Sequence, residues 1–129
     1  MTRTVIQPES LKDPRPRYSQ GIRTEGGSLL FIAGQTAVDK DGNVVGKGDI
    51  EKQAEKVFEN VGAVLRSAGG SFDNLVMTTT VLTDIEYREA YNKVRLKYYG
   101  RNQPTSTLVV VKALGGEDFL IEIDGIAVI

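Results

Sequence analysis

Hydrophobic residues recur at helical spacing in the segment that follows Asp49. This residue is a favourable N-cap, Glu51 lies in the first turn, and Gly69-Gly70 stops the pattern. The apolar face between these limits consists of Ile50, Ala54, Val57, Phe58, Val61, Val64, Leu65 and Ala68. The pattern therefore predicts an amphipathic helix that ends at the two glycines.

A second, shorter helix is predicted after residue 84. Thr83 or Asp84 can cap it, and Gly100 lies near its end. Its apolar face consists of Tyr87, Ala90, Tyr91, Val94 and Tyr98. Because the tyrosines keep helical spacing, we interpret them as core residues rather than as a platform on which nucleic-acid bases stack.

Strand-like patterns occupy much of the remaining chain, at residues 18–23, 28–33, 75–82, 106–113 and 119–128. Turn-forming residues at 24–27 lie between the first two strands and predict a β-hairpin. Residues 1–16 hold three of the four prolines and are interpreted as an extended N-terminal arm. The order of elements predicts a single α+β domain, residues 1–129, in which two helices cover one face of a mixed sheet.

The segment 39–48 is dense in turn-forming residues. A calcium-binding EF-hand loop beginning at Asp39 would need glycine at position 44 and glutamate at position 50, where the chain has Val44 and Ile50. We therefore interpret this segment as a surface loop or a small hairpin.

Two strands carry apolar side chains at consecutive positions, in the runs 29–32 and 108–111. Both faces of such strands favour burial, yet only two helices are available as cover. Self-association is therefore expected, because a second copy of the chain can cover the other face.

The charge balance is nearly neutral, with 16 basic and 17 acidic residues and a formal net charge of −1. Neither nucleic acid nor a membrane is expected as a partner, since no excess of positive charge favours phosphate groups and no apolar run approaches the length that spans a bilayer. The chain has no cysteine and no histidine. Catalysis would then use carboxylates, tyrosine, arginine, lysine, hydroxyls, backbone groups or water, and a reducing, cytoplasmic location is expected.

Several short motifs occur in a characteristic order along nearly the whole chain. They are Tyr18-Ser-Gln-Gly21, Phe31-Ile-Ala-Gly-Gln35, the helix that ends Ala68-Gly-Gly70, Thr78-Thr-Thr-Val-Leu-Thr-Asp84, Tyr91-Asn92, Gln103-Pro104 and Ile121-Glu-Ile-Asp-Gly-Ile-Ala127. In order and spacing they resemble the Rid family, the reactive intermediate deaminases, which also carry the older label endoribonuclease L-PSP.

This resemblance implies a chorismate-mutase-like fold and a homotrimer with three ligand clefts at its subunit interfaces. It also implies hydrolysis, without a cofactor or metal, of reactive enamines and imines such as 2-aminoacrylate to a 2-oxo acid and ammonia. The ligand is then a small carboxylate or an imine-type molecule.

The resemblance assigns roles to individual residues. Tyr18 and Glu122 match the tyrosine and the glutamate of the catalytic cleft, while Gly34 and Asn92 match a strand glycine and a helix asparagine of the same cleft. From the residues alone, Tyr18 could equally serve packing, and Glu122 could face solvent or an intersubunit ion pair.

One position departs from the family pattern. The segment Pro104-Thr-Ser-Thr107 has Ser106 where relatives carry an arginine that binds the substrate carboxylate, with Thr107 beside it. As candidate substrate-binding residues, Ser106 and Thr107 could hydrogen-bond a neutral or differently shaped ligand, or they could be ordinary strand residues. A hydroxyl is a far weaker partner for a carboxylate than a guanidinium, so deamination of 2-aminoacrylate is expected to be weak or absent. The candidates for a replacement guanidinium are Arg15, Arg17 and Arg23, with Arg17 included among the substrate-binding residues.

Two functions therefore remain open. The first is an imine or enamine deaminase with an altered ligand, which the retained Glu122 favours. The second is a ligand-binding or scaffold trimer without catalysis, which Ser106 favours. A ribonuclease is disfavoured, because the chain has no histidine for an acid-base pair and no obvious basic groove.

Overall fold

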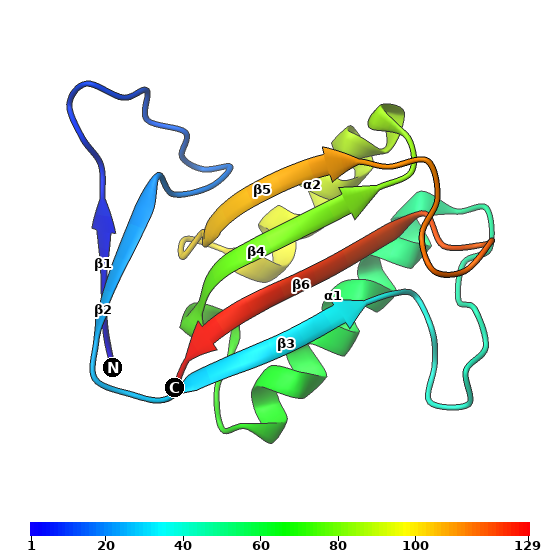
Figure 1. Ribbon diagram of the computed structural model, residues 1–129, viewed down its shortest axis with the longest axis horizontal. Coiled ribbons are helices and arrows are strands. Elements are labelled where there is room, and N and C mark those ends of the chain that lie inside the picture. The colour runs from blue at the N-terminus through cyan, green and yellow to red at the C-terminus, as the bar shows by residue number, and fades with distance from the viewer.

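Strand β6 lies inside a four-stranded sheet whose order is β3-β6-β4-β5, as a computed structural model of residues 1–129 shows. It pairs antiparallel with β3 and β4, while β4 and β5 are parallel. Both α-helices cover one face of this sheet and leave the other open (Figure 1). The elements are β1 Thr2–Ile6, β2 Gly21–Glu25, β3 Leu29–Gln35, α1 Ile50–Ser67, β4 Leu75–Leu82, α2 Arg88–Tyr99, β5 Thr105–Val110 and β6 Ile121–Val128, with short 3-10 helices at Phe72–Asn74 and Ile85–Tyr87.

The predicted α+β architecture is confirmed, and both helices form where their patterns indicate. The Asp49 side chain accepts a hydrogen bond from the backbone N–H of Lys52, which caps α1. Asp84 caps the 3-10 turn that leads directly into α2. Neither helix has the length and apolar composition needed to cross a membrane.

An aromatic cluster joins the two helices. The ring of Phe58 on α1 stacks on that of Tyr98 with centroids 5.0 Å apart and meets the ring of Tyr99 edge-on at 5.2 Å. Tyr91 and Tyr99 are buried, and Tyr98 packs against the same core. Tyr91 in the core, with Tyr87 and Tyr98 packed against it, agrees with the predicted spacing, and Tyr99 is a core residue that the pattern did not include.

The predicted hairpin between residues 18–23 and 28–33 is wrong. Strand β2 instead pairs antiparallel with β1, which lies within the predicted arm, and β3 pairs with β6. Gly26 and Gly27 both have positive φ angles and turn the chain there. Ser28, just before β3, exchanges two backbone hydrogen bonds with Ile129, just after β6, so the pairing of these strands continues past their ends. The other edge of β3 has no partner strand.

Gln53, fully buried on α1, holds two loops against that helix. Its side-chain nitrogen donates to the carbonyl oxygens of Gly46 and Asp118, at 3.2 and 2.8 Å, and its oxygen accepts from the N–H of Leu120 at 2.9 Å. One amide thus satisfies backbone groups from the segments that precede α1 and β6.

Replacing Gln53 with alanine is expected to lower the free energy of unfolding by about 2–4 kcal/mol, because a buried N–H and two carbonyl groups lose their partner. Urea denaturation measures this change. The exposed neighbour Lys52 is the control, and Lys52→Ala is expected to stay within about 0.5 kcal/mol of the wild type. Similar losses in both variants would contradict this role of Gln53.

Candidate functional site

Glu122 and Gly34 lie against each other on the open face of the sheet. An idealised Cβ atom on Gly34 would lie 2.7 Å from the carboxyl carbon of Glu122, so a larger residue at position 34 would displace this side chain from its present position. The register between β3 and β6 shifts between Ile32 and Gln35, next to this contact. Irregular pairing of this kind often redirects a side chain at a functional site.

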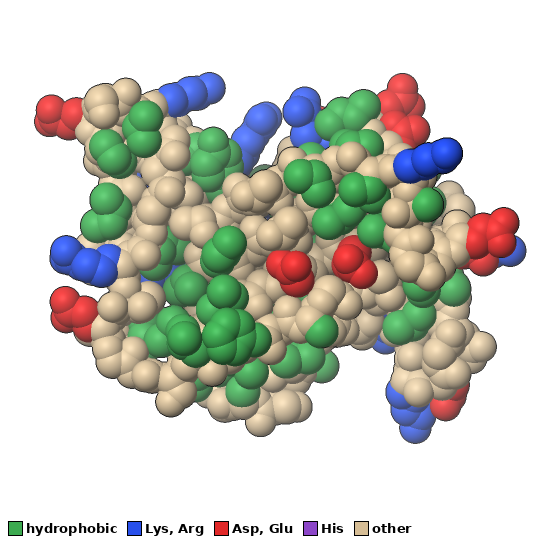
Figure 2. Space-filling view, viewed as in Figure 1, with side chains coloured by type: hydrophobic (Ala, Val, Ile, Leu, Met, Phe, Trp, Pro, Cys, Tyr) green, Lys and Arg blue, Asp and Glu red, His purple; other side chains and the backbone are tan.

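The open face carries few charged groups. Glu122 and Asp124 project to it from β6, since the alternating Ile121 and Ile123 are fully buried on the helix side. Figure 2 shows two acidic side chains near the middle of this face, with hydrophobic side chains to both sides. Phe31, which pairs with Ile126 of β6, is 69% exposed on this face.

Ser106 and Thr107 point to opposite faces of β5. Thr107 aligns with Thr79, which aligns with Asp124, so Thr107 shares the open face with the carboxylates at a distance of two strands, about 10 Å. Ser106 aligns with the buried Thr78 and therefore faces the helix layer. Of the two residues, only Thr107 lies on the face that holds Glu122.

Arg17 and Asn92 lie together in a second place, a groove of about 390 Å³ between the arm and α2. The groove is lined by Pro16, Arg17, Glu89, Asn92, Lys93, Arg95 and Leu96. Ser19 anchors the arm, because its N–H donates to the Pro104 carbonyl at 3.1 Å and its hydroxyl donates to the Gln103 carbonyl at 2.7 Å.

Tyr18 precedes this anchor and is partly buried. It lines a hollow of about 400 Å³ formed within the arm by residues 12–18. Through Ser19 it is held beside the start of β5, whereas Glu122 lies on β6, and β4 separates these two strands. In one chain the structure therefore does not bring Tyr18 and Glu122 together.

The three candidates for a replacement guanidinium have different surroundings. Arg15 forms an ion pair with Asp13, whose carboxylate it binds through Nε and Nη2. This pairing lowers the pKa of Asp13 to about 2. Arg23 is exposed on the β1–β2 ribbon, and only Arg17 lines the groove with Asn92.

Sequence reasoning missed Arg95, which lines the same groove and is only 4% exposed. Its Nη2 donates to the side-chain oxygen of Gln103 at 3.0 Å. Its guanidinium carbon lies 5.5 Å from the ring centre of Tyr91 and 5.8 Å from that of Tyr99. A signal for it exists in the sequence, since Arg95 follows Tyr91 by four residues and so falls on the apolar face of the helix.

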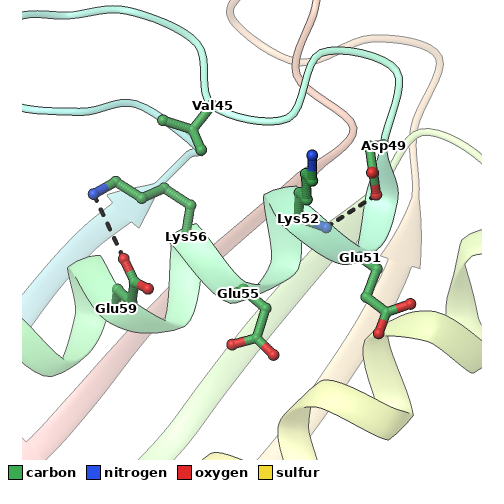
Figure 3. Close-up of a pocket in the computed structure, with 7 residues that line it drawn as sticks. All are labelled: Val45, Asp49, Glu51, Lys52, Glu55, Lys56 and Glu59. Carbon is green, nitrogen blue, oxygen red and sulfur yellow. Dashed lines mark hydrogen bonds and ion pairs between the residues drawn. The ribbon is translucent and has the colours of Figure 1, made fainter.

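The largest hollow on the surface, about 510 Å³, lies along the exposed side of α1 and contains none of the predicted site residues (Figure 3). Its lining is mostly charged: Val45, Asp49, Glu51, Lys52, Glu55, Lys56 and Glu59. Two of these carboxylates bind α2, because Lys93 pairs with Glu51 at 3.2 Å and Lys97 with Glu55 at 2.6 Å. We interpret the charged residues of this hollow as part of the contact between α1 and α2 rather than as a ligand site.

Glu55 is the best-connected group of that contact. It accepts hydrogen bonds from Lys97 and from the Tyr98 hydroxyl, at 2.6 and 2.7 Å, and these two bonds lower its pKa. Burial, followed by the bond to Glu55, raises the pKa of Tyr98. The ionised carboxylate of Glu55 thus helps to join α1 to α2.

Replacing Glu55 with glutamine is expected to destabilise the protein by about 0.5–1 kcal/mol near pH 7, because the carboxylate loses charged partners that are partly exposed to water. A lowered pKa means that this contribution is present above the ordinary value of 4.5 and is lost as the pH falls through the folded-state pKa. Urea denaturation at about pH 7 and about pH 3.5 should therefore show the difference shrinking. Glu59→Gln, at an exposed position of the same helix, is the control, and a difference independent of pH would contradict the assignment.

Comparisons with known proteins identify the family. The family described as Endoribonuclease L-PSP matches residues 9–129. A RutC family protein of Pyrococcus abyssi is 36% identical over 127 residues, which cover 98% of each chain. Another, from Pyrococcus horikoshii, is 40% identical over 124 residues, which cover 95% of each. The chain belongs to this family, which confirms the Rid membership that its motifs predict.

Solved structures agree with this assignment. YyfB of Yersinia pestis, described as a member of the conserved Rid protein family, is 30% identical and superposes with a TM-score of 0.92 over 100% of both chains. RidA from an Antarctic Psychrobacter is 29% identical with a TM-score of 0.74, over 98% of this chain and 99% of that one. The α+β fold with two helices on a mixed sheet is that of Rid proteins.

Proposed function

We propose that this protein hydrolyses a reactive enamine or imine to a carbonyl compound and ammonia, in a small-molecule cleft between the subunits of a homotrimer. The observation that carries the proposal is the carboxylate of Glu122, for which Gly34 leaves room on a face with few other charges. A cytoplasmic location is part of the proposal and is consistent with a chain that has no cysteine.

The proposed chemistry needs little beyond an oriented water molecule. An enamine first tautomerises to the imine by gaining a proton on carbon and losing one from nitrogen, with water as the carrier. A second water molecule then adds to the C=N carbon, and Glu122 accepts its proton and passes it to the nitrogen, which gives a neutral carbinolamine. Transfer of the hydroxyl proton to the nitrogen, again through Glu122, releases ammonia and leaves the carbonyl group. In this scheme the Tyr18 hydroxyl donates a hydrogen bond to the substrate, and no cofactor or metal takes part.

The candidate residues lie in two separate places on one chain, which supports the proposal that subunits assemble. Gly34, Glu122 and Thr107 belong to the open face, whereas Arg17, Tyr18 and Asn92 lie by the arm and α2. A cleft between two subunits can combine one group from each. The exposed apolar side chains of the open face and the unpaired edge of β3 support such contacts between copies.

A second candidate function is a trimer that binds a small ligand without turning it over, and Ser106 favours it. An arginine at this position could form two charge-assisted hydrogen bonds with a carboxylate, each worth about 1.5–3 kcal/mol, whereas serine offers one neutral donor. Catalysis and ligand binding are separated by the next experiment.

The rate of 2-oxo acid and ammonia formation is to be measured with freshly generated 2-aminoacrylate and with imines that an amino-acid oxidase generates in place. Glu122→Gln is expected to lower the enzyme-dependent rate about 100-fold or more, because the general base is lost. Asp124→Asn, on the same face two residues away, is the matched control and should change the rate only a few-fold. A wild type that accelerates none of these reactions would favour the binding trimer, and equal losses in both variants would refute the role of Glu122.

Phe31→Asp is expected to shift the protein from trimer to monomer, because a charge on this apolar side of β3 would have to lose its hydration in the interface. Sedimentation velocity measures the change. Ile85→Asp is the control, since Ile85 is 53% exposed but lies in the turn before α2. A Phe31→Asp protein that sediments like the wild-type trimer, or a wild type that is already monomeric, would contradict the proposed interface.

A further inference from the structure

Arg95 is a buried cation without an acidic partner. It is 4% exposed, and no carboxylate lies within ion-pair distance of it. Of its three guanidinium nitrogens only Nη2 donates a hydrogen bond, to the neutral side chain of Gln103, and the buried Nε has no partner. Burial of a charge is costly unless it is paired, so this guanidinium has donors available for an anion.

The contacts that Arg95 does make hold it in place without neutralising it. The rings of Tyr91 and Tyr99 lie next to the guanidinium, an arrangement that favours a cation but leaves its N–H groups free. The Gln103 amide that accepts from Nη2 is itself fixed, because its nitrogen donates to the Gly100 carbonyl at 2.7 Å. The guanidinium is therefore positioned before any ligand arrives, which reduces the entropy lost on binding.

The groove that Arg95 lines carries further donors. Arg17 also has no carboxylate within ion-pair distance, and Asn92 contributes an amide. Lys93 pairs with Glu51 on α1, and Glu89 is the single carboxylate in the lining. Two unpaired guanidinium groups against one carboxylate leave the groove positively charged, and its volume of about 390 Å³ suits a small molecule.

Arg95 also lies on the correct side of the sheet to replace the arginine that is absent at position 106. The side chain of Ser106 faces the helix layer, in register with the buried Thr78. Arg95 reaches the same layer from α2, and through Gln103 it contacts the segment that leads into β5. The guanidinium of Arg95 and a side chain at position 106 therefore lie on the same side of the sheet.

We propose that Arg95, with Arg17 and Asn92, binds the carboxylate of a small 2-oxo acid or of the corresponding imine. The inference rests on the proposed function for the identity of the ligand, and on the structure for the site. A planar carboxylate matches the fork of donors that a guanidinium presents. This assignment changes one expectation, because the absence of arginine at position 106 no longer makes weak deamination of 2-aminoacrylate the expected result.

The test is a titration of the intact protein with pyruvate, monitored by calorimetry or by protein NMR, with the neutral pyruvamide as a matched probe. Pyruvate is expected to bind at least tenfold more tightly than pyruvamide. Arg95→Gln is expected to weaken pyruvate binding about tenfold to hundredfold through the loss of charge-assisted hydrogen bonds, and to leave pyruvamide binding unchanged. Arg101→Gln, which removes an exposed arginine just beyond α2, should bind pyruvate like the wild type.

Arg17→Gln keeps the test decisive if Arg95→Gln does not fold, and Ser106→Arg extends it if Arg95→Gln does fold. Arg17 is exposed, so Arg17→Gln is expected to weaken pyruvate binding several-fold without a change in the thermal midpoint. In a folded Arg95→Gln protein, the additional change Ser106→Arg is expected to recover binding, because it returns a guanidinium to the same layer. Wild-type affinity for pyruvate in both Arg95→Gln and Arg17→Gln would overturn the proposal, as would a wild type that binds inorganic phosphate but not pyruvate.

Glu122→Gln separates this inference from the proposed function. Binding needs the anion site and not the general base, and the loss of the Glu122 carboxylate removes a negative charge from the cleft, so Glu122→Gln should bind pyruvate at least as tightly as the wild type. Pyruvate binding that depends on Arg95, in a protein without hydrolytic activity, would refute the proposed reaction and support the anion site. Hydrolysis that depends on Glu122 but is unaffected by changes at Arg95 and Arg17 would refute the anion site alone.

Discussion

The alternation of side chains along β6 is the constraint on which the rest of the structure depends. Because β6 lies between β3 and β4, each of its side chains meets either the helices or the open face. Ile121 and Ile123 are fully buried, and Glu122 and Asp124 lie on the opposite face. A shift in register by one residue would place both carboxylates in the core, at a large cost in desolvation. One strand therefore determines both the hydrophobic core and the position of the candidate base.

The two helices cover only one of the two faces of this sheet. They cover the face that bears the isoleucines, and the other face presents Phe31, Leu29 and Met77 to solvent, as the strand registers show. The same asymmetry divides the candidate residues, since Arg17 and Asn92 line a groove between the arm and α2, whereas Glu122 lies on the face that the helices leave open. In the proposed trimer, a single contact between subunits would both cover the apolar face and complete the proposed cleft.

Features that depend on local interactions could be predicted from the sequence, whereas features that depend on long-range pairing could not. Helix α1 could be predicted because its cap, its apolar face and its terminating glycines are all local. The prediction of a hairpin between β2 and β3 was wrong because Gly26 and Gly27 specify a turn but not the partner of β3. That partner is β6, near the other end of the chain. The alternation of side chains along β6 predicts which face of the sheet carries Glu122. Its contact with Gly34 depends on the pairing of β3 with β6, which no local pattern predicts.

Position 106 shows how a departure from a family pattern can be compensated elsewhere in the fold. The attraction between an anion and a guanidinium depends on the distance between them and not on which element carries the guanidinium. Strand β5 and helix α2 face the same layer, so a charge lost from the strand can be supplied by the helix. Burial of Arg95 without a carboxylate partner is costly in the absence of a ligand, and Nε has no hydrogen-bond partner. The proposed anion would supply the missing negative charge and acceptor.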